Sequence, residues 1–100
     1  MKELKGIKIG KYYIEKPIVQ GGMGVGVSWD QLAGTVSKNG GLGTISGICT
    51  AYYDNLKYCK KVVNGRPIGA EALNSKEAMM EIFKNARKIC GDKPLACNIL

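Results

Sequence analysis

Short apolar stretches alternate with glycine-rich turns and two amphipathic segments along this chain. Residues 7–9 and 12–14 alternate in polarity around Gly10-Lys11, which predicts a β-hairpin with glycine at the first position of a two-residue turn. Pro17 interrupts the pairing, and residues 18–20 are predicted to form a short, fully buried strand. We expect the hairpin to act as a lid or plug before the main fold.

An amphipathic helix is predicted after the glycine-rich stretch 21–26. Ser28 and Gln31 have the spacing of a capping box, and Asn39-Gly40 is typical of a left-handed helix end. The apolar face consists of Leu32, Ala33 and Val36. Residues 42–46 are predicted to be the second strand, which completes a βαβ unit.

Residues 47–73 fit no simple periodicity and are long for a connecting loop, which is typical of a functional or separately structured segment. Apolar and aromatic residues between 52 and 59 predict one short helix within it, namely Tyr52, Tyr53, Leu56, Tyr58 and Cys59. Arg66-Pro67 and Gly69 predict an irregular connection after this helix.

The clearest amphipathic helix follows this insertion. Asn74 and Glu77 have capping-box spacing, Gly91 is the expected end, and Pro94 prevents continuation. Apolar residues recur at helical intervals: Ala78, Met79, Ile82, Phe83, Ala86, Ile89 and Cys90. Residues 95–100 predict a third buried strand.

Strands that alternate with helices imply an α/β fold with a parallel sheet and right-handed crossovers. Three parallel strands with helices on one side leave an open apolar face. That face leaves two arrangements open: self-association, or the N-terminal portion, about three βα units, of a TIM (β/α)₈ barrel of about 250 residues. We expect the barrel, because nothing follows Leu100 to close the sheet. The predicted parts are the hairpin (1–15), the βαβ unit (17–46), the insertion (47–73), and the helix with the third strand (74–100).

Composition narrows the class of protein. The chain has 100 residues, 45% of them hydrophobic and 23% charged, as in a single globular domain. Its net charge is +7, but the basic residues are scattered and form no aromatic-basic platform, so we expect no nucleic-acid partner. No apolar run approaches the roughly 20 residues of a membrane span, and no signal peptide is recognisable. We therefore expect a cytoplasmic protein without a membrane partner.

The chain carries little chemistry of its own. Its four cysteines form no Cys-x-x-Cys pair and it has no histidine, so structural thiols are expected in place of a metal site. No nucleophile elbow, Walker loop or paired carboxylates occur. The difficult chemistry must then come from a bound cofactor or from residues beyond Leu100.

The glycines after the first strand are the leading candidate site. Gly22-x-Gly24 begins a dinucleotide fingerprint, but the third glycine falls at Gly26, out of register, and the second strand ends in Ser46-Gly47 where an acid is expected. A flexible turn is an alternative. We favour close packing of bare backbone against a flat ring system at the carboxyl end of a barrel strand.

Three other residues are singled out beside these glycines. Asn98 is the polar residue of the third strand and is either a ligand-facing amide or a satisfied core residue. Met23 either faces the ligand or packs in the core. Gln20 is polar within the first strand and is a candidate to hold the glycine loop instead of touching the ligand.

Residues 17–23 (PIVQGGM), followed by LAG-x-VS-x-x-GGLG over 32–43, resemble the opening of the nitronate monooxygenase family. The FMN-dependent enoyl-[acyl-carrier-protein] reductases share this opening. Residues 93–100 (KPLACNIL) resemble the third strand of the family. The match is specific over residues 16–47 and 92–100.

The resemblance implies a TIM barrel that binds FMN and no metal. It places the backbone of Gly21, Gly22 and Met23 against the isoalloxazine and gives Asn98 a flavin contact. The phosphate-binding glycines and catalytic histidine of the family belong to later strands, so no catalytic residue is assigned, and the chain is expected to be an inactive N-terminal fragment.

The implied enzyme oxidises alkyl nitronates with dioxygen. Whether it forms a homo-oligomer is left open by the resemblance. The alternatives are an FMN-dependent enoyl-thioester reductase that uses NAD(P)H, and a non-catalytic α/β module that self-associates.

Overall fold

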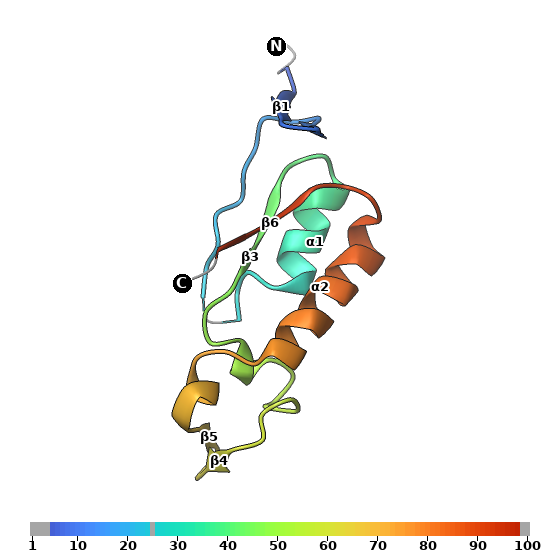
Figure 1. The fold of residues 1–100 in the computed structure, drawn as a ribbon. Coiled ribbons are helices and arrows are strands. Elements are labelled where there is room, and N and C mark those ends of the chain that lie inside the picture. The colour runs from blue at the N-terminus through green and yellow to red at the C-terminus, as the bar shows by residue number, and fades with distance from the viewer. Residues whose placement is uncertain (1–4, 25, 99–100) are drawn as a thin grey trace.

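A small parallel sheet with two helices on one face forms the centre of the chain. The computed structural model describes residues 5–24 and 26–98. Helices α1 (Asp30–Lys38) and α2 (Lys76–Cys90) lie side by side against strands β3 (Gly43–Ser46) and β6 (Leu95–Asn98) (Figure 1). The buried core lies between these layers and contains Trp29, Ala33, Ile45, Ile82 and Ala86. The predicted α/β class is confirmed, whereas closure into a barrel stays a prediction.

The sheet has the predicted parallel order. β3 pairs with β6 so that Ser46 lies opposite Asn98. On the other side of β3, Val19 forms a parallel bridge with Leu42. The Gln20 N–H donates to the Leu42 carbonyl at 2.9 Å, which extends this edge of the sheet. The segment before α1, β3 and β6 therefore lie in that order across the sheet.

Two predictions about strand burial are wrong. Ile18 and Val19 are 53% and 57% exposed, because they lie at the sheet edge and outside the core beneath the two helices. β6 is half-buried at residues 95–97, and Asn98 is exposed. Residues 99–100 of the predicted third strand lie outside the described residues.

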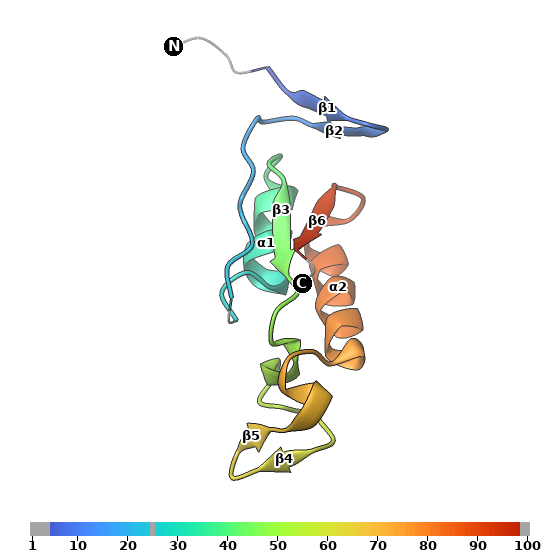
Figure 2. The same ribbon diagram turned by 60° about the vertical axis from the view of Figure 1, so that its left-hand side comes forward.

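The N-terminal hairpin is confirmed. β1 (Ile7–Ile9) and β2 (Tyr12–Ile14) pair antiparallel with Ile9 opposite Tyr12, and Gly10 has a φ of +58°. The hairpin lies beyond the amino ends of β3 and β6 (Figure 2). Its side chains are largely exposed except Ile14, which is 2% exposed.

Helix α1 begins differently from the prediction. Ser28 does not cap it, because its buried hydroxyl donates to the Thr44 carbonyl at 2.5 Å. Trp29 takes the capping position and makes no side-chain capping bond. The predicted end is confirmed: Gly40 has a φ of +97°, and its N–H donates to the Ser37 carbonyl at 3.1 Å.

The insertion does not contain the predicted helix. One turn of 3₁₀ helix, η1 (Thr50–Tyr52), is followed by Asp54, Asn55 and Leu56 with φ values of +53°, +56° and +65°. Three successive left-handed residues cannot continue a right-handed helix.

A second hairpin occupies the part of the insertion predicted to be irregular. β4 (Val62–Val63) pairs with β5 (Arg66–Pro67) around Asn64-Gly65, and both turn residues have positive φ. A 3₁₀ turn, η2 (Gly69–Ala72), leads on to α2. The insertion lies beyond the carboxyl ends of β3 and β6 (Figures 1 and 2).

Helix α2 is confirmed with a shifted cap. The Ser75 hydroxyl, not the Asn74 side chain, accepts the capping hydrogen bond from the Ala78 N–H at 3.3 Å. Gly91 ends the helix with a φ of +62°, as predicted. Within the described residues, neither helix is long and apolar enough to cross a membrane.

Candidate functional site

The residues that follow three parallel segments meet at the carboxyl edge of the sheet. The first segment leads into Gly21–Met23, β3 ends at Ser46, and β6 ends at Asn98. The Gly47 N–H donates to the Asn98 carbonyl at 2.8 Å, which ties the last two together. Ligands of open parallel sheets and of barrels bind at this edge.

Gly22 and Asn98 face each other directly. A Cβ atom on Gly22 would lie 2.9 Å from the Asn98 Cγ, closer than side chains tolerate. Two residues predicted separately from the sequence are therefore neighbours. Met23 is 45% exposed, which contradicts the alternative that it packs in the core.

Gly21 differs from Gly22 in its surroundings. A Cβ atom there would meet nothing within 4 Å, and the φ of Gly21 is outside the left-handed region. The described part of the chain therefore gives no steric reason for glycine at this position. The backbone of Gly21 is instead open to the approach of a planar molecule.

The loop also carries backbone hydrogen-bond donors. The backbone N–H groups of Gly21, Gly22 and Met23 donate to no group in residues 5–24 or 26–98. The Met23 carbonyl, in contrast, accepts from the Ser28 N–H at 2.9 Å. The loop is thus anchored at its end while its donors stay available to a ligand with acceptor atoms.

The Gln20 side chain holds the start of the loop. Its Nε2 donates to the Gly21 carbonyl and to the Ser28 hydroxyl and lies 3.2 Å from the Thr44 carbonyl. Its Oε1 accepts from the Thr44 N–H at 3.0 Å. The interpretation that Gln20 holds the glycine loop is confirmed.

The end of β3 is fixed to the start of α1. The Trp29 indole N–H donates to the Ser46 carbonyl at 3.1 Å, and the Ser46 N–H donates to the Ser28 carbonyl at 2.7 Å. Ser46 is 4% exposed. These bonds give the candidate site a rigid floor.

A tyrosine network that the sequence did not reveal joins the insertion to both helices. The Tyr53 hydroxyl donates to Asp30 Oδ2 at 3.0 Å and accepts from Asn85 Nδ2 at 2.9 Å. Its ring meets the Trp29 ring edge-on, with centroids 5.5 Å apart. Burial raises the pKa of Tyr53; the Asn85 hydrogen bond lowers it and the Asp30 carboxylate raises it further. These residues lie far apart in sequence and form no motif, so no local signal could have found them.

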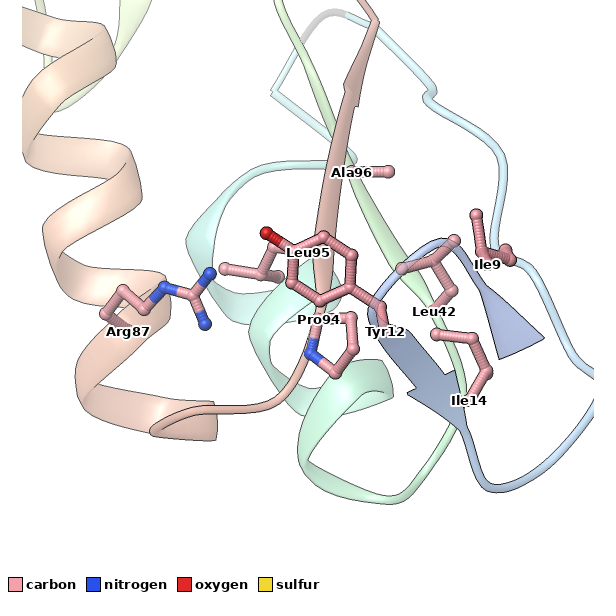
Figure 3. Close-up of a pocket in the computed structure, with 8 residues that line it drawn as sticks. All are labelled: Ile9, Tyr12, Ile14, Leu42, Arg87, Pro94, Leu95 and Ala96. Carbon is pink, nitrogen blue, oxygen red and sulfur yellow. The ribbon is translucent and has the colours of Figure 1, made fainter. Parts of the chain in front are cut away.

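A hollow of about 200 Å³ lies at the opposite, amino edge of the sheet (Figure 3). Apolar side chains of the hairpin and of the strand starts line it, together with Arg87. The guanidinium of Arg87 donates to the carbonyls of Gly91 and Lys93 at 2.9 and 2.6 Å, so it stabilises the turn after α2. This hollow lies away from Gly22 and Asn98 and is not part of the candidate site.

No metal centre is present among the described residues, which hold no cluster of three or more histidine, cysteine or acidic side chains. The four cysteines form no disulfide. Cys97 lies next to Asn98 in β6, and burial raises its pKa.

Comparison with known proteins agrees with the motifs. A family profile described as nitronate monooxygenase matches residues 5–100. No curated protein matches the chain.

Proposed function

This chain belongs to the nitronate monooxygenase family, and on that premise we propose that it builds the flavin-facing edge of an FMN-dependent enzyme. The enzyme oxidises alkyl nitronates with dioxygen. The family is one of oxidoreductases. The binding of FMN, the nitronate substrate and the use of dioxygen are the parts that we propose for this chain.

One observation carries the proposal: open glycine backbone, with three N–H groups that donate to no group among the described residues, lies beside the Asn98 amide. The isoalloxazine ring of FMN is flat, and the atoms along its pyrimidine edge are mostly hydrogen-bond acceptors. A flat ring needs close backbone approach, which Gly21 permits. The acceptors need donors, which the loop N–H groups and the Asn98 amide supply. The site therefore fits FMN.

Bound FMN would supply the electron transfer between nitronate and dioxygen. The residues of this chain bind and orient it: Gly21, Gly22 and Met23 through their backbone, and Asn98 through its side chain. None of them can serve as a general base, and the chain contains no histidine. We therefore assign the proton transfer to a residue outside these 100.

We extend the proposal to the fold. Parallel order with both helices on one face is the arrangement of successive βα units in a TIM barrel, with the helices outside. The exposed side chains of Ile18 and Val19 at the sheet edge fit a position that further barrel strands cover. Alternatively, a second copy of the chain covers this edge. The mass of the native protein distinguishes a longer chain from a dimer.

Anaerobic mixing tests the function. The natural full-length protein is loaded with FMN and mixed, without oxygen, with an alkyl nitronate or with NADH. We expect the nitronate to bleach the flavin absorbance and air to restore it. Bleaching by NADH alone would instead indicate the enoyl-thioester reductase, and bleaching by neither would refute a flavin oxidoreductase of either kind.

A further inference from the structure

We infer that Gln20 is a positioning residue for the flavin, because by holding the Gly21 carbonyl it turns the Gly22 N–H toward the cofactor. The inference rests on the proposed function and goes beyond it. The family resemblance gives Gln20 no role, and the side chain lies behind the loop instead of against the ligand surface.

The Gln20 carboxamide is held in one orientation. Its Oε1 accepts from the Thr44 N–H at 3.0 Å. Its two N–H hydrogens donate to the Gly21 carbonyl and to the Ser28 hydroxyl, and the nitrogen lies 3.2 Å from the Thr44 carbonyl. The Ser28 hydroxyl accepts from Nε2 and donates to the same Thr44 carbonyl. A side chain that is hydrogen-bonded through both its oxygen and its nitrogen can act as a rigid anchor.

This anchor determines the direction of the next peptide group. Gln20 Nε2 donates to the Gly21 carbonyl. In a planar trans peptide the carbonyl of one residue and the N–H of the next point in opposite directions. The Gly22 N–H is therefore directed away from the Gln20 side chain. It finds no acceptor in the described residues, and Asn98 lies beside the same glycine.

The anchor matters because the two residues that it orients are glycines. Glycine has more backbone freedom than any other residue, so an unanchored Gly21-Gly22 pair would sample many orientations of this peptide. Binding would then have to restrict that freedom, which weakens affinity. Gln20 removes this entropy cost before the cofactor arrives.

Two variants and a matched control test the inference in the natural full-length protein. Gln20→Met keeps the length of the side chain and removes every hydrogen bond of its carboxamide. Gln20→Glu keeps an acceptor for the Thr44 N–H and removes the donor to the Gly21 carbonyl. The control, Ser37→Ala, also removes a buried hydroxyl, but one that donates to the Pro94 carbonyl and accepts from the Gly43 N–H at the amino edge of the sheet, away from Gln20. For each protein, FMN titration gives the Kd, absorbance gives the spectrum of the bound flavin, and thermal unfolding gives the Tm without FMN.

We expect both Gln20 variants to raise the Kd for FMN about tenfold and to shift the flavin spectrum. Ser37→Ala should lower the Tm comparably and leave the Kd and the spectrum near those of the wild type. The inference is overturned if Gln20→Met retains the wild-type Kd and spectrum, or if Kd follows Tm alike in all three variants. Loss of folding in both Gln20 variants would also overturn it, because the role would then be structural. Failure of the wild type to bind FMN would refute the proposed function itself.

Discussion

The Asn98 side chain lies in the space that a Cβ atom on Gly22 would need, with the Asn98 Cγ 2.9 Å from that position. Asn98 ends β6, and Gly22 belongs to the loop after the Val19 bridge. Their contact joins the glycine loop to the end of β6 at the carboxyl edge of the sheet. It also means that each residue can be altered to probe the other.

Asn98→Ala should weaken FMN binding. Loss of one amide hydrogen bond costs about 1 kcal/mol, which corresponds to a rise in Kd of about fivefold. FMN titration of the full-length protein measures it. Asn39→Ala is the control, because that amide donates to the Thr35 carbonyl at the far end of α1. An unchanged Kd in Asn98→Ala would remove Asn98 from the site.

Gly22→Ala should act through Asn98. The exposed Asn98 side chain can rotate away from the new methyl group, so we expect a loss of stability below about 1 kcal/mol. The rotated amide no longer reaches the flavin, and FMN binds more weakly. In the Asn98→Ala background the same substitution should add little, because the two Cβ atoms would be 3.4 Å apart. Fully additive losses of affinity in the double variant would contradict this coupling.

Gly21→Ala should separate binding from folding. The new methyl group meets no described atom within 4 Å and the backbone is unstrained, so the Tm should stay within about a degree or two of the wild type, as for a neutral surface substitution. The same methyl group would stand between the backbone and a flat ring. We expect at least a tenfold rise in the Kd for FMN, and a wild-type Kd would show that the ring lies elsewhere.

How far the sequence predicted the structure depended on how local each signal was. The first hairpin, helix α2 and the parallel order follow from periodicity and glycine punctuation, which are local signals. The four predicted site residues meet at one edge because parallel strands bring their carboxyl ends together. Gln20 was recognised as a loop holder because a polar residue in an apolar strand needs a partner.

Other features depend on long-range contacts or were overlooked. Ser28 and Asn74 have good capping patterns, but Thr44 takes the Ser28 hydroxyl and the adjacent Ser75 caps α2. The prediction that residues 18–20 are buried was wrong, because burial depends on which elements cover the edge of the sheet. Asn64-Gly65 between two valines and Arg66 was a readable hairpin signal that the prediction missed.

Tyr53→Phe tests how the insertion is attached. The substitution keeps the ring and removes the hydroxyl between Asp30 and Asn85, which should cost about 1 kcal/mol of unfolding free energy. Tyr52→Phe is the matched control, because the neighbouring ring is 42% exposed and its hydroxyl makes no bond to the described residues. Denaturant unfolding measures both, and equal effects would contradict the network.

The same tyrosine should make stability sensitive to alkaline pH. The folded pKa of Tyr53 is raised above its ordinary value of 10.0, so its neutral phenol is favoured in the folded state. This stabilisation is complete below about pH 10 and is lost as the pH rises through the higher folded pKa. The difference in unfolding free energy between the wild type and Tyr53→Phe should therefore shrink in this range. A difference that grows with pH would refute the assignment.

Ser75→Ala should destabilise α2 more than Asn74→Ala. The Ser75 hydroxyl accepts from the Ala78 N–H at 3.3 Å, and loss of such a cap costs about 1 kcal/mol. Asn74 makes no capping bond to α2. Thermal unfolding of the two variants measures the difference, and the reverse order would place the cap at Asn74.

The claim that this sheet edge holds FMN is tested most directly by native mass spectrometry of the protein purified from its own source. A parallel preparation of Gly21→Leu fills the open surface with a side chain. We predict one FMN per wild-type chain and none on the variant, although both are folded. A wild-type protein without flavin, or a variant that retains it, would contradict the claim.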